Sequence, residues 1–175
     1  MINTTPNKQK GDEYEIFIAE HYRQLGYIVI KNGMIAEKDD KGVDLIAIRL
    51  LSIEMVGSRH LKANNTRIDY VMILIQCKRF ESKNQKSVIV DTKEKAQKNK
   101  QGQHSIEEIF NKMNFFIDNN YIVQNPIAHI EVFKHLIVPN KKCLDKECFK
   151  YVKNIRNASI HIIEIKKDDK TKEYE

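Results

Sequence analysis

Two short apolar stretches carry polar side chains at positions where a buried strand normally has none. The first stretch is residues 42–47, with Asp44 near its start, and the second is residues 73–78, which includes Gln76 and Lys78 at its end. Both stretches are rich in β-branched residues and have the length of a core strand. Because burying an unpaired carboxylate or ammonium group is costly, these side chains require either a partner or a function.

The spacing of Gln76 and Lys78 predicts that they act together. Residues i and i+2 of a strand project to the same face, so Gln76 and Lys78 are neighbours and Cys77 points the other way. If the two strands are adjacent, Asp44 comes next to this pair. A carboxylate, an amide oxygen and an ammonium group at one sheet edge could hold a divalent metal ion beside a cation. The alternative is a buried, hydrogen-bonded ion pair that ties the two strands together.

The composition is typical of a soluble globular protein with a basic balance of charge. The chain has 175 residues, of which 41% are hydrophobic and 31% charged, and its formal net charge is +6. This length suits a single domain with a sizeable core. A positive net charge permits nucleic-acid binding without proving it, since many basic proteins bind no polyanion.

The cysteines and the lack of long apolar runs predict a cytoplasmic location. Cys77 lies in a predicted core strand, and Cys143 and Cys148 have no second ligand pair at zinc-binding spacing. An odd cysteine count argues against a disulfide framework. The first ten residues lack the apolar region of a signal peptide, and no run approaches the roughly 20 apolar residues of a membrane span. We therefore expect no membrane association.

Hydrophobic periodicity predicts three helices. The first begins either at Pro6 or with a capping box at Asp12, and it ends at Gly26. Ser105 is the predicted N-cap of the second helix, and the third covers residues 145–154.

The remaining apolar runs predict a sheet between these helices. Five strands are expected, at residues 27–30, 43–51, 70–77, 136–138 and 160–165. The order of elements fits a meander of three strands followed by a parallel crossover. We therefore expect an α/β fold, a three-layer α/β/α sandwich with a central mixed sheet of about five strands. Residues 1–165 form one domain in this interpretation, and residues 166–175 form a charged tail that is expected to be disordered.

At this point the motifs resemble a known family, the Mrr-type branch of the PD-(D/E)xK nuclease superfamily. The resemblance is carried by Tyr14-Glu15 in the first helix, by residues 26–29, and by the runs 42–47 and 75–78. In that branch glutamine replaces the usual acidic residue of the D/E-x-K element, as Gln76 does here. The later elements also fit, whereas the connections 54–69 and 81–104 match nothing. The resemblance implies the restriction-endonuclease-like fold.

The resemblance also implies an activity and a set of catalytic residues. The expected function is a metal-dependent endodeoxyribonuclease that hydrolyses DNA phosphodiester bonds with Mg²⁺, or with Mn²⁺ as a substitute. Asp44 would bind the ion directly, Gln76 through its side-chain carbonyl and Cys77 through its backbone carbonyl. Glu15 would reach the ion through water, although without the strand motifs its residue type and position favour a capping partner of Asp12 or a solvated charge. Lys78 would orient or help to deprotonate the attacking water.

Several basic side chains could hold the phosphates of a DNA substrate. They are Lys41, Arg79, Lys93, Lys95, Lys98 and Lys100, together with Arg59, His60, Lys62 and Arg67 in the connection 54–69. Solvated loops or a solvated helix face explain the same residues.

Two further functions remain open beside a restriction-like nuclease. One is a structure-specific nuclease such as a junction resolvase, which would form a tight dimer and prefer branched DNA. The other is a non-catalytic nucleic-acid-binding subunit with the same fold. No separate recognition domain is evident, so target choice would rest on loops, on a homodimer or on another subunit. His21, His129, His135 and His161 show no ligand spacing and are assigned no role.

Overall fold

The computed structural model describes residues 6–32, 42–56, 65–78, 88–90, 104–120, 123 and 128–165. The helices are α1 (Pro6–Gln24), α2 (Ile106–Asp118), α3 (Lys146–Lys153) and the short 3₁₀ helix η3 (Lys141–Cys143). The strands are β1 (Ile28–Lys31), β2 (Leu45–Val56), β3 (Asn65–Cys77), β4 (Val88–Ile89), β5 (His104–Ser105), β6 (Ala128–Val138) and β7 (Ala158–Ile162).

A five-stranded mixed sheet is the centre of the fold. Its strand order is β1-β2-β3-β6-β7, so β3 is the middle strand. Strands β1, β2 and β3 pair antiparallel, as the predicted meander requires, while β6 is parallel to both β3 and β7. The predicted α/β class and the mixed sheet are confirmed. Strands β4 and β5 form a separate two-stranded parallel sheet that was not predicted.

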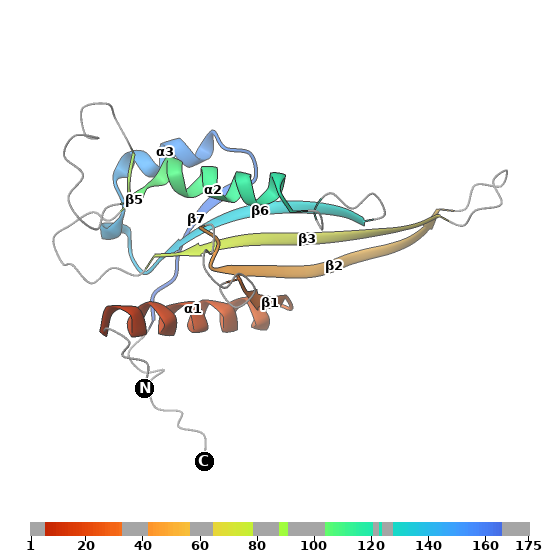
Figure 1. Ribbon diagram of the computed structural model, residues 1–175, viewed down its shortest axis with the longest axis horizontal. Helices are drawn as coiled ribbons and strands as arrows, with labels where there is room; N and C mark the ends of the chain where they lie inside the picture. The colour runs from red at the N-terminus through yellow and green to blue at the C-terminus, as the bar shows by residue number, and fades with distance from the viewer. Residues whose placement is uncertain are drawn as a thin grey trace, which may run out of the picture.

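Helices cover both faces of the sheet. Helix α1 lies against one face, and α2 and α3 lie on the other (Figure 1). Two clusters of buried side chains correspond to these layers: one contains residues of α2, α3 and the inner positions of the strands, and the other contains residues of α1 and the opposite strand positions. Along β3, Leu74 belongs to the first cluster and Ile75 to the second, as the alternation of a strand requires.

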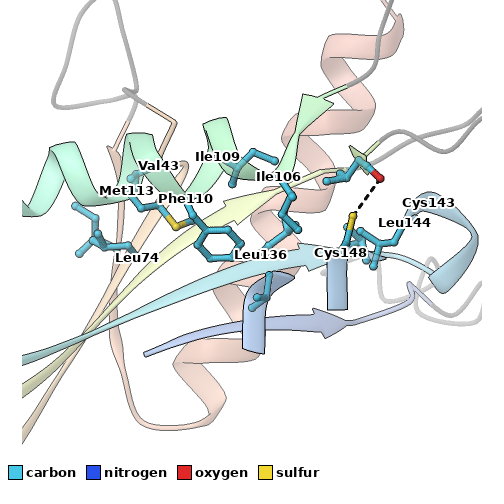
Figure 2. Packing of buried hydrophobic residues seen from close by; sticks show 14 of the residues in the cluster. Val43, Leu74, Ile106, Ile109, Phe110, Met113, Leu136, Cys143, Leu144 and Cys148 are labelled. Atoms are coloured by element: carbon cyan, nitrogen blue, oxygen red, sulfur yellow. Dashed lines mark hydrogen bonds between the residues drawn. The ribbon is translucent and has the colours of Figure 1, made fainter. Parts of the chain in front are cut away.

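The core on the α2 side shows why this stretch folds as a helix. The buried residues Ile106, Ile109, Phe110 and Met113 follow helical spacing, and they pack toward the strands, including Leu74 (Figure 2). The predicted cap is confirmed, since the Ser105 side chain accepts a hydrogen bond from the backbone N–H of Glu108. The thiol of Cys148 donates to the Val88 carbonyl at 3.5 Å and so joins α3 to β4 (Figure 2).

Helix α1 packs against the sheet through a stripe of buried apolar residues, and a glycine follows its last turn. Tyr14, Ile18 and Tyr22 are buried, and the Tyr14 hydroxyl donates to the Ile163 carbonyl at 2.8 Å, which connects α1 to the chain after β7. Gly26 adopts φ +84°, the left-handed conformation of a helix C′ residue, as predicted. The helix begins at Pro6, so the alternative start with a capping box at Asp12 is wrong.

The strands extend further than the apolar runs predicted. Pairing of β2 with β3 continues past an irregularity between Leu50 and Ser52 to the pair Val56 and Asn65, inside the segment expected to be a connection. Strand β6 begins at Ala128 instead of residue 136, because it pairs along most of β3. The first half of β6 was not predicted, because its polar and apolar residues alternate and form no continuous apolar run. Strand β7 is likewise displaced, to residues 158–162.

The described part of the chain contains buried cysteines and no membrane-spanning helix. All three cysteines are free thiols and buried, in agreement with a packing role. Among the helices in the described part of the chain, none is long and apolar enough to cross a bilayer. The tail at residues 166–175 lies outside the described residues.

A half-buried histidine of β6 connects α1 to the sheet. The Tyr22 hydroxyl and the Nδ1 atom of His135 are hydrogen-bonded at 2.6 Å, and the rings of His135 and His161 lie 4.2 Å apart. Burial, and secondarily the neighbouring His161, lowers the pKa of His135 from 6.5 to about 3. The folded protein therefore holds His135 neutral at pH values where the unfolded chain is protonated.

This histidine predicts a loss of stability in mild acid. As the pH falls from 6.5 toward 3, the unfolded chain takes up a proton that the folded protein does not, so folding weakens over this window. The free energy of unfolding should fall by up to about 1.4 kcal/mol per pH unit from this group. Urea unfolding of the wild type and of His135→Gln at several pH values measures it. The variant should show a shallower slope than the wild type, and equal slopes would contradict the assignment.

Candidate active site

The beginning of β2 and the end of β3 lie side by side at one end of the sheet, along the strand direction. Asp44 immediately precedes β2, and its backbone N–H donates to the Ile75 carbonyl at 2.9 Å. Gln76 and Cys77 are the last residues of β3. The antiparallel register, in which Leu45 faces Ile75, therefore places Asp44 beside these two residues.

The carboxylate of Asp44 is hydrogen-bonded to both residues at the end of β3. Its Oδ2 atom accepts from the Gln76 amide Nε2 at 2.5 Å and from the Cys77 backbone N–H at 2.6 Å. Asp44 is 7% exposed and Gln76 is 3% exposed, so both polar groups are buried. Since a buried carboxylate requires hydrogen-bonding partners, the two donors stabilise Asp44 in this place. The predicted meeting of Asp44 with Gln76 is present.

These atoms fit the oxygen ligands that Mg²⁺ prefers. The Gln76 Nε2 atom also lies 3.4 Å from the Cys77 carbonyl oxygen, so the amide bridges two oxygen acceptors. A half-turn of the amide exchanges its nitrogen for its oxygen. The amide oxygen would then lie next to a carboxylate oxygen and a backbone carbonyl oxygen, and these three oxygen types are a donor set for a hard divalent cation.

The same site contains few charged ligands. In the part of the chain that the structure describes, no group of three His, Cys, Asp or Glu side chains is placed to hold a metal ion. Asp44 is the one carboxylate among the three converging ligands, because Gln76 is neutral and Cys77 offers its backbone. A cation held in this way would keep several water ligands, as Mg²⁺ usually does in proteins.

Residues around Asp44 fix its backbone. Asn32 is buried, and it donates from its side-chain Nδ2 to the Val43 carbonyl at 3.0 Å and from its backbone N–H to the Asp44 carbonyl at 2.9 Å. Gly42 has φ +75°, and a Cβ atom there would lie 2.8 Å from the Cβ of Lys112. A side chain at position 42 is therefore disfavoured both by the left-handed backbone and by the close approach of Lys112. Nothing in the sequence pattern pointed to Asn32 or Lys112.

Lys78 lies directly after β3 and reaches the α2 side of the sheet. Its backbone N–H donates to the Ile137 carbonyl at 2.9 Å, which holds it between the ends of β3 and β6. Burial and then the positive charge of Lys78 lower the pKa of His104, and the hydrogen bond and charge of Lys112, with a smaller contribution from Lys78, lower the pKa of Glu108. The charge of Lys78 therefore acts on groups at the beginning of α2. Lys78 lies one residue beyond the end of β3, so its place on the face of Gln76 stays a prediction from strand alternation.

Glu15 reaches this end of the sheet from the opposite face. Its Oε2 atom forms an ion pair with Lys31 Nζ at 2.9 Å, and the Asp12 carboxylate lies 3.5 Å from the same ammonium. Burial, followed by the charges of Asp44 and Glu15, raises the pKa of the Cys77 thiol well above its usual value. The charges of Glu15 and Asp44 thus act on the same thiol. Glu15 is nevertheless paired with Lys31, a partner that the sequence pattern did not indicate.

The predicted DNA-contacting residues lie almost entirely outside the described residues. This applies to Lys41, Arg59, His60, Lys62, Arg79, Lys93, Lys95, Lys98 and Lys100. Of Arg67 the structure describes only the backbone, within β3.

Comparison with known proteins gives no relative that could assign this site. No family model, no curated protein sequence and no solved structure matches the chain.

Proposed function

We propose that this protein is a metal-dependent endonuclease that hydrolyses DNA phosphodiester bonds, with a fold of the restriction-endonuclease type. The observation that carries the proposal is the convergence of Asp44, Gln76 and the Cys77 backbone at the end of β2 and β3. The sequence resemblance to Mrr-type nucleases involves the same three positions. Lys78 follows Cys77 directly and adds a cation at the same end of the sheet.

Each residue has a separate task in this proposal. Asp44 and Gln76 would hold a divalent cation, which when bound polarises the scissile phosphate and lowers the pKa of a water molecule. Lys78 would orient the attacking water and stabilise the negative charge that develops on the phosphate oxygens. Asn32 would act as a positioning residue, because its two hydrogen bonds hold the carbonyl groups on both sides of the Asp44 Cα atom. Glu15 would contribute through water only after releasing Lys31.

A second candidate function has its own supporting observation. The Asp44 carboxylate already accepts two short hydrogen bonds from β3, and Glu15 is paired with Lys31. This arrangement also fits a carboxylate that ties two strands together, within a subunit that binds nucleic acid without cutting it. Metal binding separates the two functions, since only the nuclease requires it.

Incubation of the purified protein with DNA tests the proposal directly. Supercoiled plasmid, methylated and unmethylated, and a four-way junction are each incubated with Mg²⁺, Mn²⁺ or EDTA and analysed on a gel. Cleavage with either metal, and none in EDTA, supports the nuclease. Preference for the junction over plasmid would indicate a structure-specific enzyme. Binding to DNA without cleavage in either metal would overturn the proposal in favour of the non-catalytic subunit.

A further inference from the structure

A dense group of exposed basic side chains lies on η3 and α3. Between residues 140 and 156 the chain has six basic residues and two acidic ones, and all six basic side chains are exposed: Lys141, Lys142, Lys146, Lys150, Lys153 and Arg156. The two carboxylates are engaged locally. Asp145 caps α3 by accepting from the Glu147 N–H, and Glu147 forms an ion pair with Lys150 at 3.0 Å. This short segment therefore supplies much of the chain's net charge of +6.

The lysines of α3 are aligned along one side of the helix. Lys146, Lys150 and Lys153 are separated by four and then three residues, so they share a face, which we call the lysine face. The opposite side of α3 is buried through Cys148 and Val152. Seven residues of helix span about 10 Å, which equals about three intervals of the roughly 3.4 Å that separate the phosphates of one DNA strand along the helix axis, so the lysine face is long enough to lie along several consecutive phosphates.

The position of η3 connects this basic surface to the candidate active site. The Lys78 N–H bonds the Ile137 carbonyl near the end of β6, and η3 begins at Lys141, four residues after Ile137. Four residues of extended chain cover at most about 14 Å. Helix α3 lies on the same face of the sheet as α2 and contributes to the same buried cluster (Figure 1), and the charge of Lys78 acts on groups at the beginning of α2. A strand of DNA with one phosphate at Lys78 could continue across η3 onto α3.

We propose that η3 and the lysine face of α3 bind the phosphate backbone of duplex DNA and guide it into the candidate active site. The inference rests on the proposed nuclease function. An anionic membrane is a poorer partner, because a helix that lies in a bilayer interface inserts an apolar side, and the apolar side of α3 is buried in the core. The regular spacing of the lysines also suits a periodic polyanion.

A charge-matched pair of double variants tests this surface. Lys146→Gln/Lys153→Gln removes two charges from the lysine face with little change in helix propensity. Arg23→Gln/Arg49→Gln removes the same charge from two exposed positions near the end of α1. Fluorescence anisotropy with a labelled short duplex is recorded in EDTA over a range of salt concentrations, so cleavage does not contribute. Melting curves confirm that both variants are folded.

The lysine-face variant should bind duplex about tenfold or more weakly near 0.1 M salt, and the plot of log affinity against log salt should become shallower by about 1.8. The control variant should change affinity by less than about threefold, through the general field alone. Equal losses in both variants, an unchanged salt slope, or binding to phosphatidylserine vesicles in preference to duplex would each overturn the proposal.

The outcomes separate this surface from the nuclease. A wild-type protein that binds duplex through the lysine face but never cuts it would remove the nuclease and retain the surface. If the wild type cuts DNA and the lysine-face variant binds and cuts equally well, the surface is wrong and the nuclease stands.

Discussion

Replacing Asp44 with asparagine is expected to lower the rate of DNA cleavage in Mg²⁺ by about a thousandfold while the protein remains folded. Loss of the charged ligand should remove several kcal/mol of transition-state stabilisation, which corresponds to a factor of this size. The fold should survive because the asparagine side-chain oxygen can still accept from the Cys77 backbone N–H, as Asp44 does at 2.6 Å. Plasmid cleavage rates at saturating Mg²⁺ measure the effect.

The control for Asp44→Asn is a second measurement that does not depend on activity. Titration of the metal-free protein with Mn²⁺ by calorimetry should give binding for the wild type and much weaker binding for the variant. Asp118→Asn makes the same charge change at an exposed position on the last residue of α2 and should resemble the wild type in both assays. If Asp44→Asn unfolds the protein more easily but leaves Mn²⁺ affinity and cleavage unchanged, Asp44 only ties β2 to β3.

Lys78→Ala should abolish most cleavage and leave DNA binding largely intact. A group that positions the attacking water or stabilises developing charge contributes about a hundredfold to ten-thousandfold in rate. A single phosphate contact changes the salt slope of binding by only about 0.9, so affinity should fall modestly. Single-turnover cleavage and anisotropy in EDTA measure the two quantities separately.

Lys112→Gln provides the comparison for Lys78→Ala. Lys112 lies in the middle of α2, where its side chain packs over Gly42 and its ammonium pairs with Glu108 at 2.9 Å. Removing its charge should alter turnover little, because no catalytic task falls to it. Turnover of Lys78→Ala equal to that of the wild type would remove Lys78 from the mechanism, and equal losses in both variants would reduce its role to a contribution of general charge.

The helices were more predictable than the strand ends, for a physical reason. Helix α2 has both an N-cap at Ser105 and a continuous apolar stripe, and these local signals fix its bounds. Strand β6 owes its length to pairing with β3 from Ile68 onward, a non-local interaction that no window of sequence contains. The same applies to β2, which is paired as far as Val56 with a part of β3 that contains Asn65 and Asp69, residue types that are common in turns.

Some contacts of the candidate site could be predicted from the sequence, and others depend on tertiary packing. The meeting of Asp44 and Gln76 follows from two strand patterns and one antiparallel register, so the sequence could indicate it. The hydrogen bonds of Asn32 depend on where β1 ends relative to Asp44, and the pairing of Glu15 with Lys31 depends on how α1 packs against β1. These are consequences of tertiary packing that residue type and spacing do not reveal.

The central place of β3 in the sheet has a consequence for how the site moves. Strands on both flanks hold the end of β3: Asp44 bonds it from the β2 side, and Ile137 accepts the Lys78 N–H from the β6 side. Backbone amides with partners on both sides open only when a large cooperative unit unfolds. Amide hydrogen exchange at Cys77 and Lys78 should therefore be among the slowest in the chain, and the groups that meet a substrate would be rigid before it arrives.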